Sequence, residues 1–82
     1  MRLTFTLRNE HVAELEVDVE PWCFKYYVQR GSSLVFHYEA SAGSDPRGEV
    51  ELRRPDWMAV WFDSSGPPDV EIDGKPVEPM WR

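Results

Sequence analysis

Apolar and polar residues alternate with a period of two along most of this chain, and this alternation constrains the fold more than any other feature. Residues 2–8 place Leu or Phe at every second position, with Thr or Arg between them. Residues 13–20 repeat the pattern with Ala, Leu and Val against Glu and Asp. Successive side chains of a strand point to opposite faces, so both segments are predicted to be strands with one buried face.

The alternation continues in residues 34–39 and 49–53, whereas residues 57–62 are apolar on both faces; all three segments are predicted to be further strands. Asp73-Gly74 is the strongest hairpin signal, because a type I′ turn needs positive φ at both central residues. This turn is predicted to set Val70 across from Val77. Pro76 and Pro79 lack an amide hydrogen, so the last strand is expected to be an edge strand or frayed.

Residues 21–30 are compatible with either a strand or a short helix. Pro21 is permitted at the first position of a helix, and Gly31 could end one. Aromatic and β-branched residues at alternating positions favour the strand. We therefore predict a strand over residues 22–29 and keep a short helix as the alternative.

Short turns between consecutive segments predict an all-β fold, a small antiparallel meander of about seven or eight short strands in a single domain, residues 1–82. The meander would close as a barrel or fold over as a sandwich. In its register Leu7 faces Ala13, Arg2 faces Asp18 and residue 26 faces residue 36. Residues 41–48 are expected to form a loop, since they are rich in Gly, Ser, Asp and Pro.

Composition narrows the choice of compartment and partner. The chain of 82 residues has four Trp, four Phe and three Tyr, as a small domain with a dense core requires. Its net charge of −6 disfavours nucleic acid and anionic membranes and favours a basic partner. A single cysteine rules out an internal disulfide, and the N-terminus alternates instead of forming the apolar run of a signal peptide. We expect a cytoplasmic protein.

Catalytic and metal sites have little support. In the meander register Cys23 and His37 are diagonal neighbours with Cα atoms roughly 7–8 Å apart, too far for a base to contact its nucleophile without help. Nothing marks an oxyanion site or a third, orienting residue. His11, Cys23 and His37 lack the close spacings of zinc ligands. We expect no enzyme activity, no metal and no cofactor.

Two acidic stripes are the first candidates for a binding surface. The polar face of residues 13–20 is entirely acidic, and a shorter acidic stripe recurs in residues 69–73. One interpretation is a surface that docks on a basic protein, as inhibitors of nucleases often do. The other is a solvated face that keeps a small β-protein soluble and blocks pairing between sheet edges.

Two tryptophans are the second candidate. Positions 58, 60 and 62 are predicted to pack inward with Val50 and Leu52, which places Trp57 and Trp61 on the opposite face. Arg53 lies across from Trp57 in this register, where its guanidinium can stack on the indole ring. Exposed aromatics are typical of interface hot spots. A central strand covered on both sides would instead bury them.

The predicted function is a non-catalytic protein-interaction module, such as an inhibitor, an immunity protein or an assembly subunit. A small-ligand-binding β-barrel is the alternative from a different class. Homodimerisation would satisfy an exposed apolar face equally well. The candidate binding residues are Trp57, Trp61, Arg53, Glu14, Glu16, Asp18 and Glu20.

Overall fold

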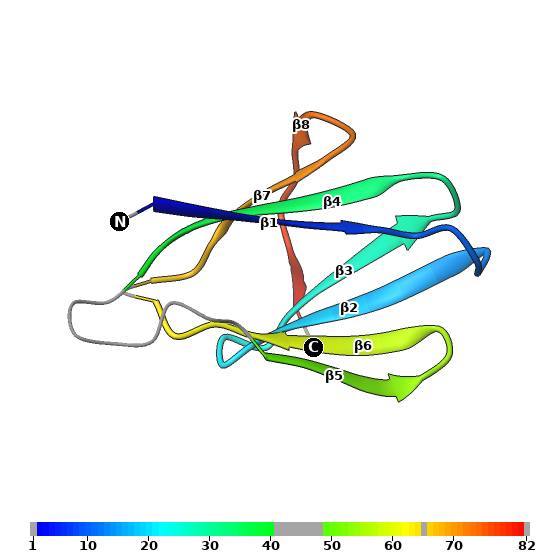
Figure 1. Ribbon diagram of the computed structural model, residues 1–82, viewed down its shortest axis with the longest axis horizontal. Coiled ribbons are helices and arrows are strands. Elements are labelled where there is room, and N and C mark those ends of the chain that lie inside the picture. Colours follow the sequence, from blue (N-terminus) through cyan, green and yellow to red (C-terminus); the bar gives the residue numbers. More distant parts are fainter. Residues whose placement is uncertain (1, 41–48, 65, 82) are drawn as a thin grey trace.

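The computed structural model describes residues 2–40, 49–64 and 66–81 (Figure 1). Within these ranges the chain is all-β, as predicted, with nine strands and no helix. The predicted loop at 41–48 lies outside the described residues. The strands are β1 (Arg2–Arg8), β2 (Glu14–Glu20), β3 (Phe24–Gln29), β4 (Ser33–Glu39), β5 (Glu49–Arg54), β6 (Trp57–Trp61), β7 (Asp69–Ile72), β8 (Lys75–Pro76) and β9 (Met80–Trp81).

The strands form two sheets, seen in the upper and lower parts of Figure 1. Sheet A has the order β1-β4-β7-β8, and sheet B has the order β5-β6-β2-β3-β9. Neighbouring strands are antiparallel except β2 and β6, which are parallel. Residues 24–29 form a strand, so the helix alternative at 21–30 is wrong. The aromatic and β-branched residues there pack on one pleated face, as their β-propensity favours.

The predicted meander is only partly correct, because the chain crosses between the sheets. Three hairpins form, β2–β3, β5–β6 and β7–β8. However, β1 pairs with β4, so Leu7 faces Leu34 and Arg2 faces Glu39. Tyr26 faces Val17 and Phe36 faces Phe5. Alternation determines which face of a strand is buried but not which strand lies beside it, so the wrong pairings kept the correct inner faces.

Asn9 marks the corner where the chain leaves sheet A for sheet B. Its side chain is buried, and its Nδ2 donates hydrogen bonds to the carbonyl oxygens of Val12 and Val28 at 2.9 and 2.8 Å. Its Oδ1 accepts from the amide of Val12 at 3.2 Å. A buried polar side chain that satisfies backbone groups in this way holds the corner in one conformation. The two sheets are joined here instead of continuing as a hairpin.

The core lies between the sheets and draws on both. Sheet B contributes the fully buried Val17, Val19 and Val28, and sheet A contributes Leu34 and Phe36. Aromatic rings interlock across the layer, with the Phe36 and Phe62 centroids 5.2 Å apart. No closed barrel is found in the described residues. None of their segments is an apolar helix long enough to cross a membrane.

The C-terminal hairpin confirms the turn prediction. Asp73 and Gly74 have φ of 50° and 82°, as a type I′ turn requires. The amide of Val77 donates to the carbonyl oxygen of Val70 at 3.0 Å, which confirms their pairing. Pro76 lies in β8, at the edge of sheet A, where a missing amide hydrogen is tolerated.

The apolar side chains of β5 are not buried as predicted. Val50 and Leu52 lie opposite Val60 and Met58, on the core side of sheet B, yet they are 49% and 68% exposed. β5 is the edge strand of a five-stranded sheet that faces a four-stranded one. The core side of this edge is therefore left uncovered by the described strands of sheet A.

Candidate functional site

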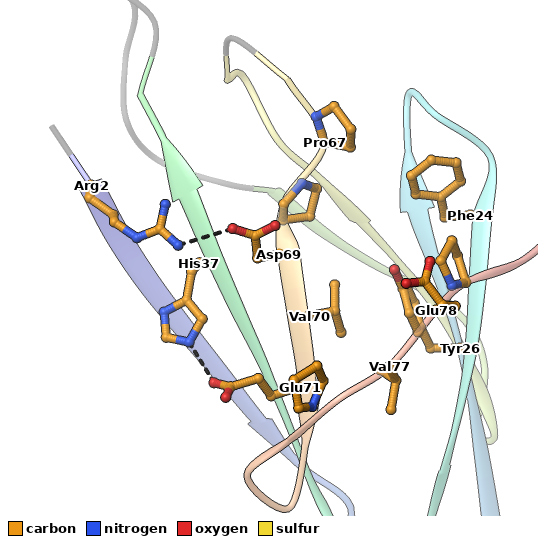
Figure 2. Close-up of a pocket in the computed structure, with 13 residues that line it drawn as sticks. Arg2, Phe24, Tyr26, His37, Pro67, Asp69, Val70, Glu71, Val77 and Glu78 are labelled. Atoms are coloured by element: carbon orange, nitrogen blue, oxygen red, sulfur yellow. Dashed lines mark hydrogen bonds and ion pairs between the residues drawn. The ribbon is translucent and has the colours of Figure 1, made fainter.

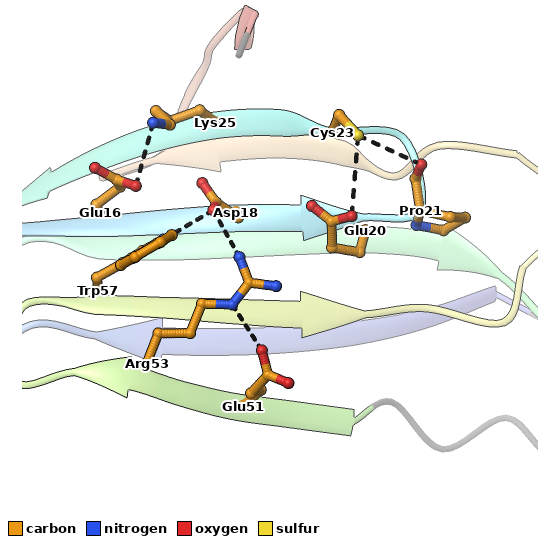
Figure 3. A network of polar contacts seen from close by, with 9 residues as sticks. All are labelled: Glu16, Asp18, Glu20, Pro21, Cys23, Lys25, Glu51, Arg53 and Trp57. Atoms are coloured by element: carbon orange, nitrogen blue, oxygen red, sulfur yellow. Dashed lines mark hydrogen bonds and ion pairs between the residues drawn. The ribbon is translucent and has the colours of Figure 1, made fainter.

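All seven predicted binding residues come together on one face of sheet B, the face that points away from the core. Figure 3 shows five of them, Glu16, Asp18, Glu20, Arg53 and Trp57. The parallel pairing of β2 with β6 sets Glu16 beside Trp57 and Glu20 beside Trp61. Arg53 reaches the same face from β5. We call this surface the outer face of sheet B. The sequence placed these side chains on a common side of their strands, and the sheet order makes the strands neighbours.

Asp18 is not a solvated member of an acidic stripe, as expected, but is fully buried in the middle of the outer face. Its Oδ2 accepts hydrogen bonds from Trp57 Nε1 at 2.8 Å and from Arg53 Nη1 at 3.1 Å. Arg53 Nε also donates to Glu51 at 2.6 Å. Trp57 from β6 and Arg53 from β5 both reach this carboxylate, which is closed to solvent. Glu20 is also buried, contrary to expectation, with 7% of its surface exposed.

Trp57 makes the predicted cation–π contact, and makes it with two arginines. The guanidinium carbons of Arg53 and Arg54 lie 5.2 and 5.6 Å from the centroid of its ring system. A bulge between Leu52 and Arg54 brings both side chains to this ring, with Arg54 as the register partner. The hydrogen bond with Glu51 raises the pKa of Arg53 above its ordinary value. Trp57 is therefore half-buried and already stacked by cations of its own chain.

Trp61 and several carboxylates remain accessible on the outer face. Trp61 is 37% exposed. Glu14 is exposed and accepts a hydrogen bond from Gln29 at 2.8 Å, while Glu16 forms an ion pair with Lys25 at 3.2 Å. The hydrogen bond with Glu16 raises the pKa of Lys25. The strand registers place both acidic and basic side chains on this face. The carboxylates are those of Glu14, Glu16, Asp18, Glu20, Glu49 and Glu51, and the cations are those of Lys25, Arg53 and Arg54.

The second acidic stripe does not form a comparable surface, because each of its carboxylates has a partner in sheet A. Asp69 accepts a hydrogen bond from Arg2 at 3.1 Å. Glu71 contacts His37 Nε2 at 2.7 Å. Asp73 accepts from the amide of Ser33 at 3.0 Å. The stripe thus joins β7 to the rest of its own sheet.

His37 belongs to a polar chain that the sequence analysis missed. Its Nδ1 lies 3.1 Å from Thr4 Oγ1, and its Nε2 contacts Glu71 on the other side. The pairing of β1 with β4 and of β4 with β7 creates this alignment, and both pairings were unpredicted. A hydroxyl, an imidazole and a carboxylate in a row can relay a proton, and here they also tie three strands together on the outer side of sheet A.

The Cys23–His37 pair expected to be adjacent is not formed. Cys23 lies in the exposed turn between β2 and β3 of sheet B, with φ of 61°, whereas His37 lies in β4 of sheet A. The Cys23 sulfur lies 3.9 Å from Pro21 O and 4.0 Å from Glu20 Oε2. Among the described residues no group of three or more His, Cys, Asp or Glu could hold a metal ion.

A crevice of about 600 Å³ opens at the other side of the molecule, between β3 and β7 (Figure 2). Phe24 and Tyr26 line it from β3, and Val70 lines it from β7. Residues 77–79, which we call the C-terminal strap, run across it between β8 and β9. Pro67 and Pro68 form part of its rim. The crevice therefore lies between the two sheets, where the chain passes from sheet A back to sheet B.

Tyr26 contributes a hydroxyl to the crevice wall, which also includes the polar side chains of Arg2, His37, Asp69, Glu71 and Glu78. Tyr26 is only 4% exposed, and the described part of the chain offers its hydroxyl no hydrogen-bond partner. Burial, together with the nearby carboxylate of Glu78 on the strap, raises the pKa of Tyr26 to about 12. The alternation in β3 predicted an inward ring at position 26. It carried no signal for the hydroxyl, whose surroundings depend on the distant strap.

Comparison of this chain with known protein families, characterised proteins and solved structures finds no match.

Proposed function

We propose that this chain is a non-catalytic interaction module that binds a basic protein through the outer face of sheet B. The observation that carries the proposal is the excess of negative charge on that face, where four accessible carboxylates (Glu14, Glu16, Glu49 and Glu51) and two buried ones (Asp18 and Glu20) lie around two tryptophans and three cations (Lys25, Arg53 and Arg54). The chain as a whole carries a charge of −6, which would steer a basic partner toward it.

The buried Asp18 cluster supports this proposal by making the face rigid. Asp18 holds the indole of Trp57 and the guanidinium of Arg53 in one arrangement. Groups that are ordered before binding lose less conformational entropy when a partner docks. Trp61, at 37% exposure, is the aromatic side chain left to enter a pocket of the partner. An inhibitor, an immunity protein or an assembly subunit would use such a face. The single cysteine suits the reducing cytoplasm.

A site-specific photo-crosslinker tests the proposal. p-Benzoylphenylalanine replaces Trp61 in one variant and Thr6 in the control, since Thr6 is exposed on sheet A. Both variants are irradiated in an extract of the producing organism, and any adduct is identified by mass spectrometry. We expect an adduct with a basic protein from position 61 alone. An adduct with a second copy of this chain would assign the face to self-association and contradict the proposal.

The purified partner then gives a quantitative check. Binding should weaken by about tenfold or more in Trp61→Ala, as expected for an interface hot spot, and by less than about twofold in Thr6→Ala. Affinity should also fall as salt is raised, because the exposed charges are screened. An affinity that changes neither with added salt nor in Trp61→Ala would overturn the proposal.

A further inference from the structure

The crevice between β3, β7 and the C-terminal strap has the dimensions and lining of a small-molecule site. Its volume of about 600 Å³ lies within the range of roughly 300–1,000 Å³ that is usual for such sites. The lining is mainly apolar, with the rings of Phe24 and Tyr26 facing Val70 and the strap residues Val77 and Pro79. An apolar body held here would be covered by both sheets.

The hydroxyl of Tyr26 gives this site a specific polar contact. The side chain is more than nine-tenths buried, yet its oxygen has no hydrogen-bond partner among the described residues. The Tyr26 oxygen is not among the buried polar atoms that lack a partner, so it still reaches solvent at the crevice. A hydroxyl that reaches an open crevice from an otherwise buried ring can exchange its water for a hydrogen bond with a ligand.

The charges around the crevice select a cation. Asp69 and Glu71 also line the crevice, where they are paired with Arg2 and His37 (Figure 2). Glu78 is exposed on the strap near Tyr26, and within the described ranges it has no ion pair. The crevice therefore keeps one negative charge beside the unpaired hydroxyl. An anionic ligand would be repelled there, and a neutral one would leave the carboxylate unused.

We propose that the crevice binds a small organic cation, a primary ammonium attached to an aromatic or aliphatic body. The ammonium lies between the carboxylate of Glu78 and the hydroxyl oxygen of Tyr26, and donates a hydrogen bond to each. The apolar body lies against Phe24 and Val70. An ammonium near these aromatic rings also gains cation–π attraction. The crevice is separate from the outer face of sheet B, so this inference does not depend on the proposed protein interaction.

Three probes of the same size and different charge test the inference. They are 3-phenylpropylamine, which is an ammonium at pH 7, the neutral 3-phenylpropan-1-ol and the anionic 3-phenylpropanoate. Binding to the whole chain is measured by calorimetry and by backbone amide shifts. We expect the amine to bind at least about tenfold more tightly than the alcohol, and the carboxylate to show no binding. Amide shifts should concentrate at Phe24, Tyr26, Val77 and Glu78.

Two variants and a matched control complete the test. Glu78→Gln removes the charge and Tyr26→Phe removes only the hydroxyl, so each should weaken amine binding by about tenfold or more. Glu10→Gln removes the same charge from an exposed residue between β1 and β2 that does not line the crevice, and should change binding by less than about twofold. Equal binding of the amine and the carboxylate, or equal affinities in Glu78→Gln and Glu10→Gln, would overturn the inference.

A lysine derivative separates a free small molecule from a protein side chain. N-Acetyl-lysine methylamide carries the same ammonium on a chain without an aromatic body. We expect it to bind at least about tenfold more weakly than 3-phenylpropylamine, because it buries less apolar surface. If it binds as tightly, the crevice is a receptor for lysine side chains and the small-molecule assignment is wrong.

Discussion

The outer face of sheet B and the crevice each enclose a polar side chain almost completely, but they differ in the hydrogen bonds that the chain supplies to it. Asp18 on the outer face is fully buried and accepts hydrogen bonds from Trp57 and Arg53. Tyr26 in the crevice is 4% exposed, and its hydroxyl lacks a partner among the described residues. On the outer face the chain supplies two donors to one oxygen of the buried carboxylate, and in the crevice its described residues supply none to the hydroxyl.

This difference separates a structural polar group from one suited to binding. A paired buried carboxylate rigidifies its neighbours and costs much free energy to disrupt. A hydroxyl that faces solvent in a crevice contributes little to the stability of the free chain and can exchange water for a ligand. On the outer face, binding must therefore rely on the side chains around the Asp18 cluster. In the crevice, the hydroxyl itself is available to a ligand.

The largest expected effect comes from breaking the Asp18 cluster. Asp18→Ala leaves Trp57 Nε1 and part of Arg53 without their buried acceptor, and should lower the free energy of unfolding by about 2–4 kcal/mol. Glu51→Ala is the matched control, because Glu51 bonds the same arginine but is exposed. It should cost less than about 1 kcal/mol. Urea denaturation measures both, and equal losses would show that Asp18 is not the centre of the cluster.

A smaller loss is expected when only the donor is removed. Trp57→Phe keeps an aromatic ring but loses the hydrogen bond to Asp18, and should cost about 1–2 kcal/mol. Trp61→Phe changes a more exposed residue of the same strand and should stay within about 0.5 kcal/mol. If both variants lose the same amount, then the indole nitrogen of Trp57 contributes nothing specific.

The crevice should show a much smaller effect. Tyr26→Phe removes a hydroxyl that has no partner in the described chain but still reaches solvent, and should change the free energy of unfolding by less than about 0.5 kcal/mol. Urea denaturation in the absence of any ligand gives the value. A loss of stability of 1 kcal/mol or more would mean that the hydroxyl is already bonded, which would remove the contrast between the two regions.

The pH dependence of Tyr26 sharpens the same contrast. Its pKa of about 12 in the folded chain exceeds the ordinary value of 10.0, because burial and Glu78 disfavour the phenolate. The stability that this gives is present below pH 10 and is lost as the pH rises from 10 toward 12. Absorbance at 295 nm should show one phenol that titrates near pH 12. In Tyr26→Phe that step should disappear, and stability should fall less between pH 9 and 11.

The sequence predicted the faces of the strands better than their neighbours. Alternation placed Tyr26 inward and Asp18, Trp57 and Trp61 on an outer face, and the registers confirm each side. The same alternation could not choose between β2 and β4 as the partner of β1, since either pairing buries the same side chains. The long-range choice depends on Asn9 at the corner between the sheets, and no periodic pattern marks a single buried amide.

The chemistry of both regions depends on contacts that a strand pattern does not encode. Asp18 is buried because Arg53 and Trp57 reach it from other strands, 35 and 39 residues away in sequence. The unpaired state of the Tyr26 hydroxyl depends on what the C-terminal strap brings near it. The sequence therefore predicted residues of the outer face, but it predicted Asp18 at the centre of that face to be solvated, and it did not predict the crevice.

Asp73 gives the smallest expected effect and lies between the two cases, since its carboxylate is paired within the chain but exposed. Hydrogen bonds from the Ser32 side chain and the Ser33 amide lower its pKa below the ordinary 3.8. The stability that they give to the β7–β8 turn is therefore present above pH 3.8 and is lost as the pH falls through the lowered pKa.

The Ser33 amide proton shift should follow this titration of Asp73. Asp73→Asn keeps an acceptor, tolerates the positive φ and cannot ionise, so the same amide should show no midpoint in acid. A Ser33 midpoint at or above 3.8 in the wild type would mean that the carboxylate gains nothing from its partners, and that an exposed pairing does not act as the buried one at Asp18 does.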